Sequence, residues 1–461
     1  MNRLSEYPRR NDLSMPGISR ARTAWQRSLA WLGLALAAGA ALAADPPLPI
    51  ASGDKHMGVA TCASSTCHGS VVEFPDSRIL HNEFITWQTD RYGNMHAKAY
   101  AKLLTPESRE IAEKLGIGPP ERAGVCLDCH ADHVDEDRRG ERFQLSDGVG
   151  CEACHGGAER WLSSHTAANR PLADNLADGM YPTHDPVHRG RLCLSCHLGN
   201  EDRMITHRIM AAGHPRLSFE LDTFTYLQPH HEVTDAYERR KGRQDGVRDW
   251  AVGQALAAQQ ILGLLMNPEH GWDGVFPELV LYDCHACHRP MTDRRWRPRP
   301  GTGLGPGAVR VNDANLVILR LILVAVEAEL SRELKTRTRE MHQATLEGRN
   351  ALTRAAERLD ATLERALQRT LAYEFGPGDL RAIFAQLIAE GEQGELLDYS
   401  AAEQAAMAAT NLVMAYQRLG VLEEAEVDAE IDQVYAAVAD EHTYTPQRLV
   451  ASLRQLHARL P

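Results

Sequence analysis

The sequence contains no cysteine outside five closely spaced pairs, and only 6% of its residues are aromatic. It also lacks a surplus of basic residues, because 62 acidic residues outnumber 50 lysines and arginines and give a formal charge of −12. Nucleic-acid binding requires basic patches, so this balance argues against that class of partner. Beyond residue 43 no hydrophobic run suits a bilayer span. The best one, Ala314–Val326, contains Arg320 and is short, which predicts a buried helix.

The N-terminal region has the composition of a secretory signal. Six arginines precede an apolar run at Leu29–Ala43, which ends in a small-x-small site. This order predicts that residues 1–43 are cleaved near Ala43 and that the chain is exported to the periplasm. An uncleaved anchor is the alternative, although fifteen residues rich in alanine and glycine are short for a span. Loss of the six arginines and two acidic residues would change the formal charge from −12 to −16.

Every cysteine pair is followed at once by a histidine. Four pairs have the form Cys-x-x-Cys-His, and the first has four intervening residues. The pairs are Cys62 and Cys67, Cys126 and Cys129, Cys151 and Cys154, Cys193 and Cys196, and Cys284 and Cys287; the histidines after them are His68, His130, His155, His197 and His288. Cys-x-x-Cys-His is the attachment site of c-type haem. We therefore predict five covalently attached haem c groups, with the stretched pair at Cys62 and Cys67 as the exceptional site.

Paired cysteines also occur in zinc sites, redox dithiols and disulfide frameworks. Structural zinc does not require a histidine directly after the second cysteine. A redox dithiol normally occurs once, near a βαβ pattern, and a disulfide framework belongs to short secreted chains. The histidine that recurs after all five pairs favours haem over these alternatives.

Composition divides the chain after its leader into two parts. Residues 44–300 hold all the cysteines and most histidines, and we expect helices and coil around five haems there. Residues 301–310 are predicted to be a Pro/Gly-rich linker. Residues 311–461 lack cysteine and carry helical spacing, which predicts a bundle of four to six helices. The predicted fold is thus mainly α: a multihaem cytochrome c domain followed by a C-terminal helical bundle.

Several local patterns support the helical prediction. Leu352, Leu359 and Leu363 recur at the spacing of one buried helix face, and Asp249–Leu265 predicts a further helix. Two residue pairs predict helix starts: Ser400 with Glu403 as a capping box, and Thr445 followed by Pro446. The isolated histidines of this half, which are His342, His442 and His457, are predicted to face solvent.

Two segments resemble the cytochrome c-554 family. Trp87–Tyr100 contains His96 and is similar to the Trp…His-Ala-x-Ala segment after that family's first haem. Gly148–Gly157, with His165 following, resembles its Gly-Val-x-Cys-Glu-x-Cys-His-Gly…His element. The resemblance covers roughly residues 58–200 and implies that His96 and His165 are distal iron ligands. The wider group includes pentahaem nitrite reductases and octahaem hydroxylamine oxidoreductase, which also end in long helices.

The chain departs from these relatives in two ways. It has five cysteine pairs where the c-554 type has four, and its first pair is stretched. None of the five motifs ends in lysine, which the nitrite reductases carry at the catalytic haem, so the resemblance does not imply nitrite reduction.

The sixth ligand of each iron decides the chemistry. A second histidine gives a closed, electron-transferring haem, whereas an open position allows substrate to bind. His184, His188, His207 and His214 lie close to the fourth pair and are further candidate iron ligands; His81 and His133 are weaker ones. Helix capping or hydrogen bonding is the alternative role for each of these histidines.

The sequence therefore predicts a periplasmic c-type cytochrome that transfers electrons between redox partners through mostly bis-histidine haems. The alternative is an oxidoreductase for a small nitrogen or sulfur compound at one five-coordinate haem, with the Cys62/Cys67 haem as first candidate. The expected partners are other cytochromes or a membrane quinol oxidoreductase. The C-terminal helices are a possible homodimer interface, and no nucleic-acid partner is expected.

Overall fold

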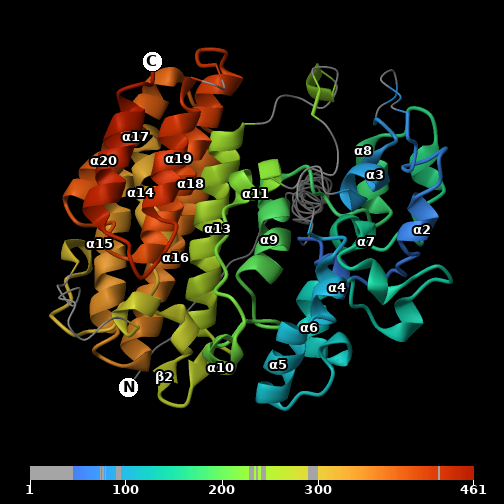
Figure 1. Ribbon diagram of the computed structural model, residues 1–461, viewed down its shortest axis with the longest axis horizontal. Coiled ribbons are helices and arrows are strands. Elements are labelled where there is room, and N and C mark those ends of the chain that lie inside the picture. The colour runs from blue at the N-terminus through green and yellow to red at the C-terminus, as the bar shows by residue number, and fades with distance from the viewer. Residues whose placement is uncertain are drawn as a thin grey trace, which may run out of the picture. The chain divides into compact units, whose positions relative to one another are not determined.

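The computed structural model describes residues 45–72, 74, 77, 79–89, 95–227, 233–234, 237–239, 245–288, 299–423 and 426–461 (Figure 1). The chain forms two units, Met1–Pro47 and Leu48–Pro461, and all elements below belong to the second. The predicted leader at 1–43 lies outside the described residues. The structure is mainly helical, as predicted.

The part of the chain that carries the first four cysteine pairs consists of short helices joined by loops. These helices are α2 (Val59–Cys62), α3 (Glu83–Gln88), α4 (Ala99–Leu103), α5 (Pro106–Leu115), α6 (Gly124–His130), α7 (Cys151–His155), α8 (Leu172–Ala177), α9 (Pro186–His197), α10 (His207–Ala212) and α11 (Leu221–Leu227). Short 3₁₀ turns connect them: η1 (Pro49–Ala51), η3 (Pro120–Arg122), η4 (Glu136–Arg138), η5 (Leu145–Asp147) and η6 (Ser164–Thr166).

The fifth cysteine pair lies between two long helices. A two-residue hairpin of β1 (Trp272–Asp273) and β2 (Phe276–Pro277) pairs Trp272 with Pro277. It is followed by η7 (Leu279–Leu281), η8 (Cys284–Ala286) and η10 (Pro300–Thr302). The long helices are α13 (Gly246–Met266), α14 (Ala314–Val326), α15 (Ala328–Ala344), α16 (Arg349–Leu371), α17 (Pro377–Glu392), α18 (Tyr399–Arg418), α19 (Asp428–Ala437) and α20 (Pro446–His457). The described residues after 311 thus form seven helices, one more than the upper end of the prediction.

Helix α13 is buried on almost all sides, because it joins the two parts of the chain. It packs against α9 on one side and against α14, α16 and α18 on others. Its residues enter two hydrophobic clusters: Trp250 packs with α14, α17 and α18, and Leu262 packs with α14, α15 and α16. The two predicted parts therefore share apolar core across α13, and the predicted boundary at 301–310 stays a prediction.

Helix starts illustrate what local patterns can and cannot predict. The last helix begins at Pro446 with Thr445 before it, as predicted, and Leu352, Leu359 and Leu363 are buried in α16. The capping box at Ser400 is wrong: α18 begins at Tyr399 with Asp398 at the N-cap position, so Ser400 already lies inside the helix, and Glu403 pairs with Arg216. Helix α14 is buried, and no helix of the described chain has both the length and the apolar content of a bilayer span.

Candidate haem-binding sites

In each of the four standard cysteine pairs, a helical turn brings both thiols to one face. Cysteines at positions i and i+3 are neighbours on a helix surface. The pairs in α6, α7 and α9 occupy the last turns of those helices, and the following histidine is each helix's final residue. In the fifth pair, His288 donates its backbone N–H to the Cys284 carbonyl over 2.7 Å, which closes a similar turn.

The stretched pair reaches a comparable arrangement through a folded loop. Helix α2 ends at Cys62, and the loop after it turns back on itself. The Cys67 backbone N–H donates to the Ser64 carbonyl over 2.9 Å, and the His68 N–H donates to the Cys62 carbonyl over 3.1 Å. The two extra residues are thus absorbed in a turn, and His68 still lies beside Cys62.

The cysteine pairs are neighbours of one another in space. The Cys62 thiol is hydrogen-bonded to Cys151, which lowers the pKa of Cys62 and raises that of Cys151. A second such bond joins Cys129 to Cys196 and lowers the pKa of Cys196 to about 6. Burial raises the pKa of Cys154 to about 12, and the charge of Cys193, a member of the fourth pair, raises it further.

None of the ten cysteines, all of which are described, is in a disulfide. No group of three or more metal-binding side chains occurs in the described residues either. The interactions between cysteine pairs link the first pair to the third, the third to the fourth, and the fourth to the second.

Four of the five proximal histidines face a second histidine ring at nearly constant separation. The ring centroids of His68 and His165 are 6.3 Å apart, and the two planes differ by 8°. The other three separations are 6.1 Å for His197 and His96, 6.4 Å for His130 and His214, and 6.0 Å for His288 and His207. Each facing residue is one of the histidines that the sequence nominated as a distal ligand.

This separation fits an iron atom between the rings. An imidazole–metal bond is about 2.0–2.1 Å long, so two of them on opposite sides of one metal place the ring centroids roughly 6 Å apart. Direct packing would bring flat rings closer, as in the 4.7 Å stack of His197 on Phe219. The histidine pairs are therefore spaced as an axial pair requires and the cysteine pairs supply attachment points, so the residues present fit haem c.

Hydrogen bonds at Nδ1 hold several of these rings in place. His68 Nδ1 bonds the Glu83 carboxylate at 3.0 Å, and His130 Nδ1 bonds the Ala99 carbonyl at 3.0 Å. Two facing histidines are held the same way: His165 by the Leu162 carbonyl at 2.7 Å, and His214 by the Pro215 carbonyl at 2.8 Å. A partner at one ring nitrogen fixes the tautomer and leaves the other nitrogen for metal.

The electrostatic surroundings favour neutral imidazole, the form that binds metal, at three of these positions. Burial lowers the pKa of His96 and of His130. Burial, followed by the charge of His96, lowers the pKa of His197 to about 4. His68 differs, because its hydrogen bond to Glu83 raises its pKa.

The fifth proximal histidine, His155, is linked to His188 through one tyrosine. Tyr181 donates its backbone N–H to the His155 carbonyl over 2.8 Å and its hydroxyl to the His188 carbonyl over 3.0 Å. His188 Nδ1 lies 2.7 Å from the Asp185 carboxylate, and Asp185 also caps α9. The structure thus connects His188 to the third cysteine pair through Tyr181.

The weaker candidates have other partners. His133 Nδ1 lies 2.6 Å from Asp128. The His81 ring is also 6.3 Å from His68, but its two nitrogens bond the Cys67 carbonyl and the Ser77 hydroxyl. His81 has a positive φ of 64°, a strained conformation for a residue with a side chain.

Two histidines are fully buried although the sequence did not predict their burial. The prediction that His342 faces solvent is wrong: its side chain is fully buried, and its Nε2 lies 2.9 Å from Asp313. His56, which the sequence did not single out, is also fully buried and bonds Asp132 at 2.7 Å. Burial alone would lower the pKa of His56, but the bond and charge of Asp132 raise it overall. Of the other two C-terminal histidines, His442 is exposed as predicted, and His457 is half-buried against Phe384.

Comparison with known families gives one match. Residues 61–156 match the family described as cytochrome c554 and c-prime. The matched segment covers roughly a fifth of the chain, contains the first three cysteine pairs and His96, and confirms the resemblance to the c-554 family over that range. It supports covalently bound haem c and a c-type cytochrome role in redox chemistry. Comparison with curated proteins and with solved structures gave no significant match.

Proposed function

We propose that this protein is a periplasmic electron-transfer cytochrome with five haem c groups, all of which have two histidine ligands. The four histidine pairs with centroids 6.0–6.4 Å apart carry this proposal, because each joins the histidine after a cysteine pair to a distant histidine at the spacing of two ligands on one iron. Each haem would be attached through one cysteine pair. The axial ligands would be His68 with His165, His130 with His214, His155 with His188, His197 with His96, and His288 with His207.

Bound haem supplies a one-electron couple at each site. The protein's own residues fix the ligand rings through Nδ1 hydrogen bonds, so that little needs to move when the charge of the site changes. Two of the sites have an apolar wall, because Leu127 and Leu194 are buried beside the second and fourth pairs. Rigid ligands in an apolar setting suit electron transfer better than substrate binding.

Contacts between the sites support an order for the electron path. The bond between Cys62 and Cys151 joins the first site to the third, and burial of Cys154 beside Cys193 joins the third to the fourth. The bond between Cys129 and Cys196 joins the fourth to the second. The distal histidines of the second and fifth sites, His214 and His207, belong to α10 and the residues that directly follow it, so these two sites are neighbours. We propose the order first, third, fourth, second, fifth.

The alternative of catalysis at the first haem receives no support from the geometry. An open iron there would require the side opposite His68 to lack a ligand. His165 faces His68 at 6.3 Å in that position. We therefore do not propose a reaction at the stretched site.

The ends of the proposed path indicate where partners would dock. Cys287 at the fifth site is exposed, and exposed apolar side chains follow the first site, with Val71 87% and Val72 68% exposed. We propose that other cytochromes or a quinol oxidoreductase exchange electrons at these two ends after export of the chain. A homodimer through the C-terminal helices remains part of the proposal and is tested by the oligomeric state of the purified holoprotein.

The experiment that tests the function is a haem count combined with spin state. Mass spectrometry of the exported protein should give the mass of a chain with five haems. Electron paramagnetic resonance of the oxidised protein should show low-spin signals alone, unchanged by nitrite or hydroxylamine. A high-spin haem that responds to either compound would overturn the electron-carrier proposal, and a mass with four haems would remove the stretched site from the path.

A further inference from the structure

A cluster of buried charged residues lies directly behind the fifth haem site. Asp283, the residue before Cys284, is its first member. The other carboxylates are Asp313, Glu390, Glu395 and Asp398, and the cations are Arg299, Arg310 and Arg320. With His342, all of these residues expose 5% or less of their surface, and we refer to them as the buried cluster.

Ion pairs connect Asp283 to the interior of the helical bundle. Arg310 lies 3.1 Å from Asp283 and 2.5 Å from Asp398. Asp398 in turn lies 3.3 Å from Arg299, which pairs with Asp313. These contacts form one continuous series of charged groups that starts next to the Cys284 attachment point.

The same series continues to the protein surface. Arg299 lies 3.6 Å from Glu395, and Glu395 lies 3.1 Å from Arg320. Arg320 contacts Glu390 at 2.6 Å, and Glu390 lies 3.7 Å from Lys335, whose side chain is 43% exposed. Charged groups therefore lead from solvent at Lys335 to the fifth haem site without an intervening apolar layer.

The cluster contains more buried acid than buried base. Five carboxylates face three guanidinium groups, so the fully ionised cluster carries an excess negative charge that burial penalises. Six polar atoms in it lack a hydrogen-bond partner among the described residues: Asp283 Oδ1, Glu395 Oε2, His342 Nδ1, Arg299 Nε and Nη1, and Arg320 Nε. An added proton would reduce the excess negative charge and would bind one of these unpaired atoms.

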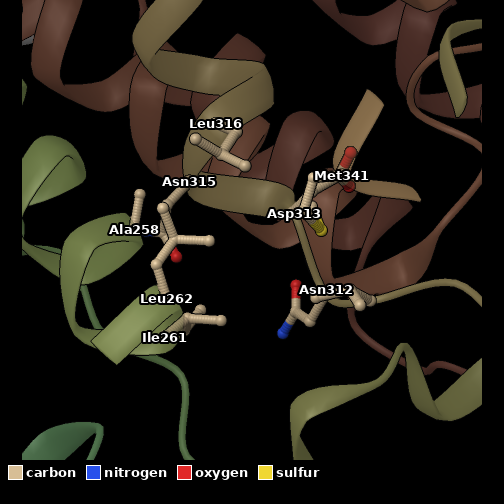
Figure 2. Close-up of a pocket in the computed structure, with 9 residues that line it drawn as sticks. Ala258, Ile261, Leu262, Asn312, Asp313, Asn315, Leu316 and Met341 are labelled. Carbon is tan, nitrogen blue, oxygen red and sulfur yellow. The ribbon is translucent and has the colours of Figure 1, made fainter. Parts of the chain in front are cut away.

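A small cavity borders the cluster at Asp313. It has a volume of about 10 Å³, which is close to the space that one water molecule needs. Figure 2 shows that α13, α14 and Met341 of α15 surround it, with the polar side chains of Asn312, Asp313 and Asn315 at its wall. A water molecule there would have polar partners and would help a proton move between cluster members.

We propose that the buried cluster takes up one proton when the fifth haem accepts an electron. The electron comes from the neighbouring haem at Cys126 and Cys129, and the proton comes from solvent by way of the Lys335 end. The added negative charge at the haem and the added positive charge in the cluster then cancel. This inference rests on the proposed five-haem path and adds proton coupling to its last step.

The surroundings of Asp283 favour a protonated carboxyl group near neutral pH. Burial, and after it the charge of Asp398, raises the pKa of Asp283 to about 7 against the opposing charges of Arg310 and Arg299. Asp313 is the opposite case, because Arg299 and His342 hold its pKa low despite its burial. The charges of Arg216 and Glu441, which do not belong to the cluster, also act on Cys284.

The test uses the holoprotein with its full haem complement. Proteins are reduced at an electrode in weak buffer, and proton uptake is followed with a pH-indicator dye between pH 6 and 8. The potential of the fifth haem, identified by its change of spin state in a His207→Ala variant, is measured over the same range. Wild type, Asp283→Asn and Asp398→Asn are compared with Asp222→Asn, a matched control with a buried carboxylate outside the cluster.

We expect the wild type to take up a proton on reduction and the potential of the fifth haem to fall as pH rises. Both Asp283→Asn and Asp398→Asn should lose most of this dependence, and Asp222→Asn should keep it. A potential independent of pH in the wild type would overturn the inference, whether or not the variants fold. Five haems with pH-independent potentials would refute the proton coupling alone, whereas a missing fifth haem would refute the path on which it rests.

Discussion

The rings of His68 and His165 lie nearly parallel, 6.3 Å apart, although almost a hundred residues separate them in the sequence. His68 is held by Glu83 and His165 by the Leu162 carbonyl, each through Nδ1. In the proposed function, the Nε2 atoms of both rings bind the iron of the first haem. This relationship makes the stretched cysteine pair an ordinary electron-transfer site in the proposal, and it leads to the first prediction.

His165→Ala should convert the first haem from low spin to high spin, because the side opposite His68 would lose its ligand. Electron paramagnetic resonance of the oxidised variant should show one new high-spin signal and four unchanged low-spin ones. His133→Ala is the matched control, since His133 bonds Asp128. A low-spin first haem in the His165→Ala variant would show that another residue, such as His81, is the ligand.

Glu83→Gln should raise the reduction potential of the first haem by an amount on the order of tens of millivolts. A carboxylate at Nδ1 increases the electron donation of the imidazole, and the neutral amide donates less. Spectroelectrochemical titration measures the change, and Glu83→Asp should restore part of it. Glu107→Gln on the exposed face of α5 serves as the control. An equal shift in both variants would contradict a role through His68.

Asp313→Ala should lower the free energy of unfolding by about 3–5 kcal/mol, because it removes the shortest ion pair of buried Arg299 and the only ion pair of buried His342 among the described residues. Denaturant titration of the holoprotein gives this value. Arg332→Ala removes an exposed pair with Glu329 and should cost about 1 kcal/mol or less. Similar losses for the two variants would mean that the buried cluster is not a stabilising element of the bundle.

Asp222→Asn should flatten the pH dependence of stability on the acid side of neutrality. Burial raises the pKa of Asp222 to about 7 against the charge of Arg418. Because the folded state then binds a proton that the unfolded state releases near pH 4, the wild type loses stability as pH rises from about 4 to 7. Thermal unfolding midpoints at pH 5 and 7 measure this loss. If the variant showed the same difference in midpoint between pH 5 and pH 7 as the wild type, groups other than Asp222 would cause the loss of stability.

The helices of the second half were predictable where one face carries the signal. In α16 the buried leucines recur at helical spacing, and in α20 Thr445 and Pro446 mark the start. The same reasoning missed His342, although it follows Leu334 and Thr338 at four-residue intervals on the buried face of α15. A polar residue on an apolar stripe is buried only if a partner such as Asp313 meets it, and no pattern within α15 reveals that partner.

By itself, the sequence determined the chemistry of attachment. Two thiols and the next histidine lie within a single turn, so their joint geometry follows from local backbone rules, and even the stretched pair closes through hydrogen bonds within its own loop. The tertiary structure alone decided which distant histidine faces which proximal one, and which carboxylates are buried behind Cys284. Those contacts join residues far apart in the chain, such as His96 with His197 and Asp283 with Arg310, and they exist only because the helices that carry them pack together.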